Sequence, residues 1–417
     1  MTTEQSIDRE PILDPDFYAA NGYPHEAWTR LRRESPVHHF EDAALEPFWA
    51  VTKHADIVAI SKQPEHFLNA PRLLMPSRGM EVQEEFPVRM LLNMDNPDHT
   101  AYRNLLKGRF SPQALRNMPL DVEGIAREIV DKIDSAGEEA EIDFVSDVSA
   151  YLPIAVVADL LGVPRSDWRT LFRWTNEVIG STDPEYQHEG ETPQEAIRRT
   201  RLELFTYFTE LIRERRETPR DDVVSHLAAA RIDGEYLPDH ELLSYFFLLV
   251  LAGNETTRNA TTGGLLAFIE NPGEWERLRR DPALLDSAVE EILRWTSPVI
   301  HFVRTANEDC EVHGKKIRAG ERLVLFYPSA NRDEDVFDEP FRFRIDRKPN
   351  RHIAFGIGEH FCLGANVARL ELRLIYRELA QRVEFMELAS PPERLASSIV
   401  GGVKHMRVRY RTSRRAA

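Results

Sequence analysis

Cys362 lies in a stretch of chain, HIAFGIGEHFCLG at residues 352–364, that is unusually rich in glycine. Glycines so closely spaced disfavour regular structure and indicate a loop whose backbone approaches another group. A helical pattern begins directly after Cys362 and extends to about residue 382. The free N–H groups at a helix N-terminus lower the pKa of a nearby thiol and bind its sulfur. This position therefore suits a thiolate, either as a nucleophile or as an iron ligand.

Two other roles for this cysteine must be weighed. A lone cysteine is more often a small buried apolar side chain. Zinc is disfavoured because neither a second cysteine nor a close histidine pair accompanies Cys362. The other cysteine, Cys310, lies in a strand-like segment, so the sequence offers no disulfide framework and fits a reducing compartment.

A second unusual stretch is LAGNETT at 251–257, inside a helical pattern that extends over about 239–270. Glycine costs about 1 kcal/mol relative to alanine in a helix interior, and polar residues are unexpected in a buried helix. One interpretation is a helix whose polar residues face internal water. The other is a local helix distortion, in which Ala252 and Gly253 leave room for a ligand beside Glu255 and Thr256.

Several charged residues could bind an anionic group or stabilise the cysteine loop. His99 and Arg103 are four residues apart and share one face of a predicted helix. Arginine forms bidentate contacts with carboxylates and stays charged when desolvated. Glu291 and Arg294, three residues apart, predict an ion pair, which at a surface is worth only a few tenths of a kcal/mol.

The elements that must position these residues are mainly helical. Strand-like segments occur near 36–52, 299–326 and 383–412, and no flexible linker divides the chain. We therefore expect one large, mainly α domain over residues 1–417 with a small β-rich region. Residues 70–93 lack any clear period and predict a long loop, whereas 166–217 contain helical patterns.

Composition limits the class of protein. The net charge of −16 argues against nucleic acid or an anionic membrane as a partner. The most apolar run, at 242–253, is too short to span a bilayer, and the first residues lack the pattern of a signal peptide. We expect a soluble cytoplasmic protein.

The stretch F-G-x-G-x-H-x-C-x-G at 355–364 resembles the haem-binding signature of the cytochrome P-450 family, and A-G-N-E-T at 252–256 is similar to its oxygen-activation motif. The resemblance extends from residue 49 to residue 410 and is nearest to bacterial terpineol-hydroxylating and steroid-oxidising branches. It implies the family fold, a triangular helix-rich prism with a small β region.

The same resemblance implies a role for each motif residue. Cys362 would be the axial thiolate of haem b, Thr256 would assist O2 activation by hydrogen bonding, and Glu255 would relay protons. Glu291, Arg294 and a later arginine, matched by Arg342, would fix the cysteine loop. The implied haem contacts are His99, Arg103, Ala252, Arg304, His352, Phe355 and Gly364.

The implied activity is hydroxylation of a hydrophobic small molecule, a terpenoid or steroid, in an apolar pocket. Electrons would come from a separate ferredoxin and an NAD(P)H-dependent reductase. The implied substrate-lining residues are Leu248, Leu251, Ala252, Val299, Ile300, Ile399 and Val400. A basic stripe could dock the donor, although a solvated face balanced by Glu371 and Glu378 is an alternative; it comprises Arg369, Arg373 and Arg377, with Lys107 and Arg109 added.

Other functions remain open at this point. A peroxide-driven haem enzyme would need no electron partner, but the Glu255–Thr256 pair favours O2 activation. A non-catalytic haem-thiolate sensor or carrier would keep Cys362 without needing that pair. A helical protein without haem would require all these motifs to coincide by chance.

Overall fold

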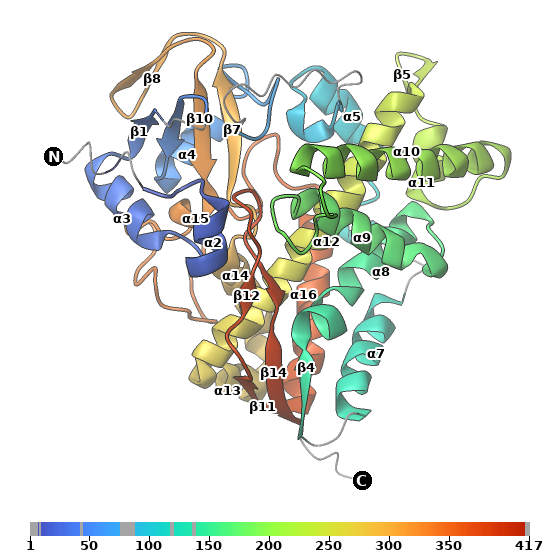
Figure 1. The fold of residues 1–417 in the computed structure, drawn as a ribbon, viewed down its shortest axis with the longest axis vertical. Coiled ribbons are helices and arrows are strands. Elements are labelled where there is room, and N and C mark those ends of the chain that lie inside the picture. The colour runs from blue at the N-terminus through green and yellow to red at the C-terminus, as the bar shows by residue number, and fades with distance from the viewer. Residues whose placement is uncertain are drawn as a thin grey trace.

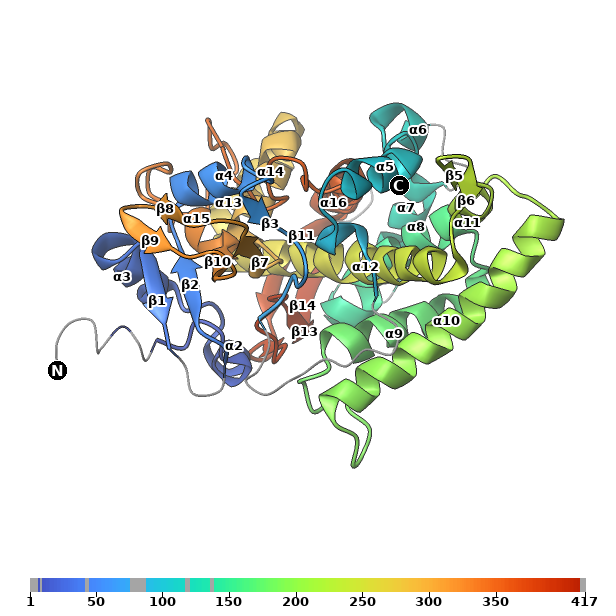
Figure 2. The ribbon, with the colours of Figure 1, turned by 90° about the horizontal axis from the view of Figure 1, so that it is seen from above.

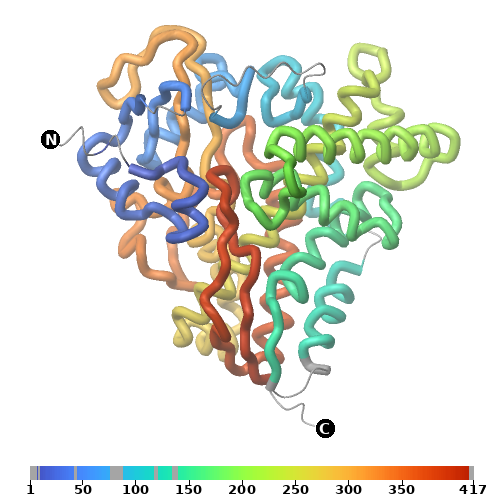
Figure 3. Tube along the Cα trace, in the orientation of Figure 1, coloured from blue at the N-terminus to red at the C-terminus, as the bar shows by residue number. Residues whose placement is uncertain are grey.

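The computed structural model describes residues 7, 10–41, 45–75, 88–116, 121–135 and 139–412. The molecule tapers from a broad end to a narrow one (Figures 1 and 3). The predicted mainly helical architecture is confirmed. Within the predicted 70–93 loop, residues 76–87 lie outside the described residues.

The helices span most of the chain. They are α2 (Pro15–Asn21), α3 (His25–Glu34), α4 (His54–Ser61), α5 (Asp98–Lys107), α6 (Pro112–Arg116), α7 (Val122–Ser135), α8 (Tyr151–Leu161), α9 (Trp168–Ile179), α10 (Pro193–Glu217), α11 (Val223–Ala228), α12 (Asp239–Glu270), α13 (Pro272–Arg280), α14 (Leu285–Thr296), α15 (Tyr327–Ala330) and α16 (Ala365–Arg382). None of the described helices is long and apolar enough to cross a membrane.

The strands form one sheet of five, one of three and three two-stranded pairs. They are β1 (Val37–Phe40), β2 (Phe48–Val51), β3 (Phe67–Leu68), β4 (Glu139–Asp143), β5 (Arg231–Ile232), β6 (Glu235–Tyr236), β7 (His301–Ala306), β8 (Cys310–Val312), β9 (Lys315–Ile317), β10 (Arg322–Phe326), β11 (Val383–Leu388), β12 (Glu393–Arg394), β13 (Val403–His405) and β14 (Arg407–Thr412). The five-stranded order is β1-β2-β10-β7-β3, in which only the β2–β10 pair is parallel. In Figure 1, β1, β10 and β7 lie on the left beside α2, α3 and α4, and helices α7 to α11 lie on the right.

Helix α12 is the central element of the fold. It has 32 residues, which corresponds to about 48 Å, and Figure 2 shows it crossing the molecule. It packs against α8, α9, α14 and α16. Because its apolar residues face these neighbours on several sides, the helix is buried along most of its length.

Candidate active site

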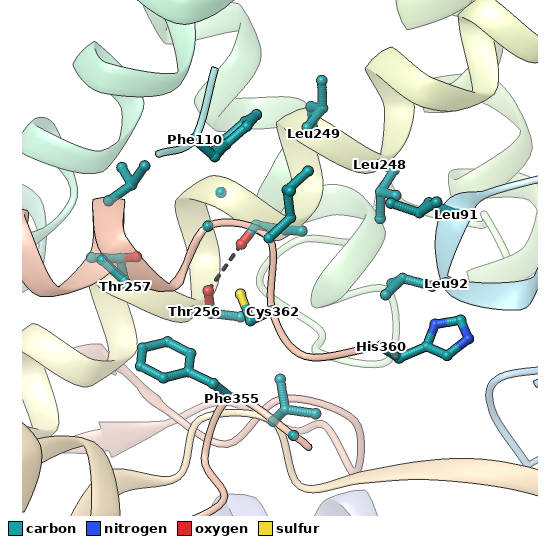
Figure 4. A pocket seen from close by; sticks show the side chains of 18 of the residues that line it. Leu91, Leu92, Phe110, Leu248, Leu249, Thr256, Thr257, Phe355, His360 and Cys362 are labelled. Atoms are coloured by element: carbon teal, nitrogen blue, oxygen red, sulfur yellow. Dashed lines mark hydrogen bonds between the residues drawn. The ribbon is translucent and has the colours of Figure 1, made fainter. Parts of the chain in front are cut away.

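A large cavity lies between α12 and the cysteine loop. It encloses about 1680 Å³ of space free of protein atoms, including the part that is open to solvent. Its walls come from α5, α8, α12, β7 and the loop that precedes α16. Figure 4 shows the Cys362 sulfur and the Thr256 hydroxyl among the side chains that line it.

The cysteine loop holds Cys362 at the wall of this cavity. The Cys362 N–H donates to the carbonyl of Phe355 (2.9 Å), and α16 begins three residues later at Ala365. Gly356 and Gly358 have φ values of +69° and +80°, which favour glycine. A Cβ on Gly358 would also approach the Ser61 carbonyl oxygen to 2.3 Å, so the loop can pack on α4 only without one.

The thiol of Cys362 is exposed to the cavity but is surrounded by protein. Burial raises its pKa, against the opposing effects of the Gly364 N–H and of the Arg103 and Arg369 charges. Gly364 is the N-cap of α16, so the helix N-terminus lowers the pKa as expected, but burial outweighs this effect in the protein alone. A metal cation at the sulfur would add the positive charge that favours the thiolate.

Thr256 lies on the face of α12 that forms a wall of the cavity. Its hydroxyl donates a hydrogen bond to the carbonyl of Ala252 (2.9 Å), which lies four residues earlier in α12. The helix is continuous here, so the predicted local distortion is wrong. Gly253 instead permits close packing of α8, because a Cβ would meet the Val157 side chain at 2.4 Å.

Glu255 points away from the cavity. Its carboxylate pairs with Arg258 and accepts a hydrogen bond from the Asn259 amide (3.0 Å). Arg258 also donates to the side chain of Asn176 in α9 (2.7 Å), and its guanidinium lies 5.4 Å from the ring of Phe172. Both charged side chains are almost completely buried. Glu255, the predicted proton relay, is thus linked through Arg258 to α9, a helix of the 166–217 segment.

Three of the predicted polar haem contacts line the cavity together. They are His99, Arg103 and Arg304. His360, which is absent from the predicted contacts, joins them by stacking on His99 with ring centroids 3.9 Å apart. Its place two residues before Cys362, in H-x-C, is a signal that could have found it.

Burial and neighbouring cations lower the pKa of both imidazoles. The value falls to about 4 for His99, where Arg103 adds to burial, and to about 2 for His360, where His99, Arg304 and Arg103 contribute. Among the described residues that line the cavity, Glu371 is the one acidic residue, and burial raises its pKa, which favours its neutral form. At their lowered pKa values, the imidazoles of His99 and His360 are neutral near pH 7. The positive charge of the cluster comes from Arg103 and Arg304, which suit a group that carries carboxylates.

The prediction that His352 contacts haem is not supported by the geometry. Its imidazole is buried and bonds to Glu290 (3.0 Å), which also receives two hydrogen bonds from Arg369 (2.6 and 2.9 Å). His352 does not line the cavity, whereas the predicted contacts Ala252, Phe355 and Gly364 do. The carboxylate of Glu290 draws the imidazole away from the cavity.

The predicted ion pair between Glu291 and Arg294 is present and completely buried, with a 2.7 Å contact. The third member is Arg347 rather than Arg342, because the Arg347 Nε lies 3.1 Å from Glu291. The side chain of Arg342 is exposed and pairs with Glu339 (3.0 Å). Only its backbone carbonyl joins the cluster, as an acceptor from Arg294 and Arg347.

Of the predicted substrate-lining residues, Leu248, Ala252 and Val299 line the cavity. Leu251 does not, because it is on the opposite face of α12, and Ile300 is buried among the β7 and β10 side chains. Ile399 and Val400 pair through their backbones with Ile300 and Val299 and also lie outside the lining. Apolar lining residues that the prediction missed include Leu91, Leu92, Phe110, Val157, Leu249 and Phe302.

The predicted basic stripe is largely neutralised by ion pairs. Arg373 pairs with Asp286 (2.6 Å). Arg377 pairs with Glu123 (2.8 Å) and Glu378 (3.1 Å). Arg369 pairs with Glu290 and Arg109 with Asp221, each at 2.6 Å. Glu378 balances the stripe as predicted, but Glu371 does not, because it faces the cavity.

Comparisons with known proteins identify the family. Residues 75–405 match the family model "Cytochrome P450". The chain is 36% identical to "Cytochrome P450-terp" of Pseudomonas sp, over 98% of both chains. It is 37% identical to "Steroid C26-monooxygenase" of Mycolicibacterium smegmatis, over 93% of this chain and 90% of the relative. Its fold is similar to the crystal structure of CYP108D1 from Novosphingobium aromaticivorans, with a TM-score of 0.88, 35% identity and 98% of both chains covered.

Proposed function

Since the chain belongs to the cytochrome P450 family of haem-thiolate monooxygenases, we propose that it hydroxylates a hydrophobic terpenoid or steroid. The observation that carries this proposal is that one apolar cavity has the Cys362 thiol, the Thr256 hydroxyl and a cationic cluster in its walls. Electrons would come from a cytoplasmic ferredoxin and its reductase. Docking near Arg373 and Arg377 would require these side chains to exchange their partners Asp286 and Glu123 for acidic groups of the donor.

The residues present fit haem b. Cys362 would ligate the iron through its sulfur, and His99, Arg103, Arg304 and His360 would hold the propionates. His99 supports this assignment because its buried Nε2 has no hydrogen-bond partner among the described residues. When bound, the haem supplies the oxygen chemistry, and its electronic properties depend on the thiolate. The protein binds and orients the haem and the substrate, and it excludes water from the cavity.

The cavity wall on the α12 side favours a substrate held by shape. The described side chains that line the cavity from α12 and from residues 91–92 carry no charge, and they include Leu91, Leu92, Leu248 and Leu249. A carboxylate or amine on the substrate would therefore have no partner there, and its desolvation would oppose binding. The names of the relatives, with a terpene and a steroid, agree with this class.

Thr256 and Glu255 would handle protons at the cavity wall. The Thr256 hydroxyl donates to Ala252, so its oxygen is free to accept a proton or hydrogen bond from the cavity side. Glu255 is on the rear face of the same helix, with its Oε1 held by Asn259 and Arg258. We propose that rotation of the Glu255 carboxylate brings a proton to the Thr256 side.

The carbon monoxide spectrum of the reduced protein tests the thiolate, and substrate-induced changes in iron spin state test binding. The Thr256→Ala variant should keep both signals but send most electrons to hydrogen peroxide, because it loses the hydroxyl. The matched Thr256→Ser variant should stay coupled. Full coupling of reductant to product in Thr256→Ala would contradict the role of Thr256.

The same measurements separate the rival functions. A sensor or carrier would show the thiolate spectrum but would form no product from any terpenoid or steroid supplied with ferredoxin and reductase. A peroxide-driven enzyme would form product from hydrogen peroxide faster than from O2 and reductant. A spectrum typical of histidine-ligated haem would contradict ligation by Cys362.

A further inference from the structure

The face of α12 that points away from the cavity carries an unusual set of polar residues. Asn254, Glu255 and Arg258 are each no more than 1% exposed. Asn254 and Arg258 are four residues apart, and Glu255 and Arg258 are three apart, so all three lie side by side on one helical face. Polar side chains this deeply buried are expected to have hydrogen-bond partners.

These side chains are only partly satisfied. Neither the Nδ2 nor the Oδ1 of Asn254 has a hydrogen-bond partner among the described residues. The Oε2 of Glu255 and the Nε of Arg258 also lack one. The carboxamide, the carboxylate and the guanidinium therefore offer both unused donors and unused acceptors within one or two helical turns.

Such a set matches the requirements of internal water. A buried polar atom without a partner costs free energy, and buried water molecules form about three hydrogen bonds to groups of this kind. A water molecule both donates and accepts, so it could bond to Asn254 Oδ1 and Glu255 Oε2 as a donor and to Arg258 Nε or Asn254 Nδ2 as an acceptor. An apolar contact could satisfy none of these atoms.

We propose that Asn254, Glu255 and Arg258 enclose an internal water site, and that Asn254 is a positioning residue for the proton that Glu255 carries toward Thr256. A water molecule held by Asn254 passes a proton from bulk solvent to the Glu255 carboxylate, giving up one proton as it receives another. Each proton that leaves Glu255 toward the cavity is thereby replaced. The water site follows from the unpartnered atoms alone, whereas the proton role rests on the proposed function.

The outer end of this site is formed by the α9–α10 region. Asn176 of α9 accepts a hydrogen bond from Arg258 (2.7 Å). The half-buried Tyr186, between α9 and α10, lies within electrostatic range of both Arg258 and Glu255. Solvent would therefore reach the site past these two side chains, and movement of α9 would affect the Arg258 contact.

Two substitutions of Asn254 give opposite results for a hydrated and a dry site. In a hydrated site, Asn254→Leu displaces water and leaves Glu255 and Arg258 unsatisfied, so the melting temperature of the holoenzyme should fall by about 2–4 °C. Asn254→Ser keeps a hydroxyl and admits water, so it should stay near the wild type. In a dry site, Asn254→Leu would raise the melting temperature and Asn254→Ser would lower it, which would overturn the proposal.

The proton role has its own readout. With ferredoxin and reductase, Asn254→Leu should slow coupled turnover about tenfold and increase the solvent isotope effect, while Asn254→Ser retains both values. An unchanged isotope effect in Asn254→Leu would overturn the positioning role and leave the water site standing. Full coupling in Thr256→Ala would contradict the proposed function without altering the melting temperatures, so the two failures are distinguishable.

Discussion

Two buried Glu–Arg pairs with the same i, i+3 spacing lie on two different helices, α14 and α12. Glu291 and Arg294 hold the segment before the cysteine loop, and Glu255 and Arg258 lie behind the cavity wall in α12. Both pairs are almost completely removed from solvent. Sequence spacing alone makes them equivalent, but their hydrogen bonding differs.

The pair at Glu291 is saturated. Its carboxylate accepts hydrogen bonds from Arg294, Arg347, the Arg344 backbone N–H and the Asn350 amide. Arg294 in turn donates to the backbone carbonyls of Asn331, Pro340 and Arg342. Burial of charge is costly unless every group is paired in this way. The cluster therefore fixes three segments of chain in one arrangement.

The pair at Glu255 is open. One carboxylate oxygen and one guanidinium nitrogen lack partners, and the neighbouring Asn254 adds two more such atoms. A saturated pair resists change because each movement breaks several bonds, whereas an open pair can exchange partners and protons. The contrast supports a structural role for the first pair and agrees with the proton role that we propose for Glu255 in the second.

Removal of each glutamate should give the largest effect and test this contrast directly. Glu291→Ala leaves two buried arginines uncompensated, so it should reduce the free energy of unfolding by about 3–5 kcal/mol. Glu255→Ala leaves one arginine that still contacts Asn176, so it should cost less stability but should lower coupled turnover. Urea unfolding and product yield per electron measure the two effects.

Glu210→Ala serves as a control, because it removes only an exposed i, i+3 partner of Arg213 on the surface of α10. It should change neither quantity appreciably, since exposed pairs are worth at most about 1 kcal/mol. Equal losses of stability in Glu291→Ala and Glu255→Ala would contradict the distinction between saturated and open pairs.

The sequence predicts the mainly helical fold, the long central helix and the two motifs, because strong periodicity and closely spaced functional residues are local signals. The direction in which each α12 side chain points can also be predicted from the sequence. A residue advances about 100° per position around the helix, so Leu251 and Arg258 share a face that is opposite Thr256. The prediction that Leu251 lines the cavity ignored this direction. The H-x-C spacing of the motif likewise places His360 close to Cys362.

Other features depend on contacts between distant segments, which spacing does not encode. Arg342, Arg344 and Arg347 all follow Glu291 by similar distances, and only the turns after α15 decide which guanidinium reaches it. His352 was expected at the cavity, but Glu290 of α14, far earlier in the chain, binds its ring. Such outcomes are set by tertiary packing rather than by local preference.

The arginine assignment gives the next largest expected effect. Arg347→Met should destabilise the protein by about 3 kcal/mol, because it removes one of the two arginine partners of buried Glu291 and the Arg347 donor to the Asp338 carbonyl. Arg342→Met should cost less than about 1 kcal/mol, because only an exposed pair with Glu339 is lost. Unfolding midpoints of the two variants measure the difference. A greater loss of stability in Arg342→Met than in Arg347→Met would make Arg342 the third member of the Glu291–Arg294 cluster.

The smallest expected effect concerns the Glu290 cluster beside the cysteine loop, which is neither saturated like Glu291 nor open like Glu255. Although burial opposes ionisation, hydrogen bonds from Arg369 and His352 lower the pKa of Glu290 to about 2. An acid with a lowered pKa in the folded state contributes stability above its unfolded pKa of about 4.3, and this contribution is lost as the pH falls toward 2. Glu290→Gln should therefore be less stable than the wild type at pH 7, and the difference should shrink below about pH 4. Urea unfolding over this range measures it, with Glu123→Gln as a control at an exposed partner of Arg377. A difference that stays constant with pH would mean that Glu290 does not anchor the loop through its charge.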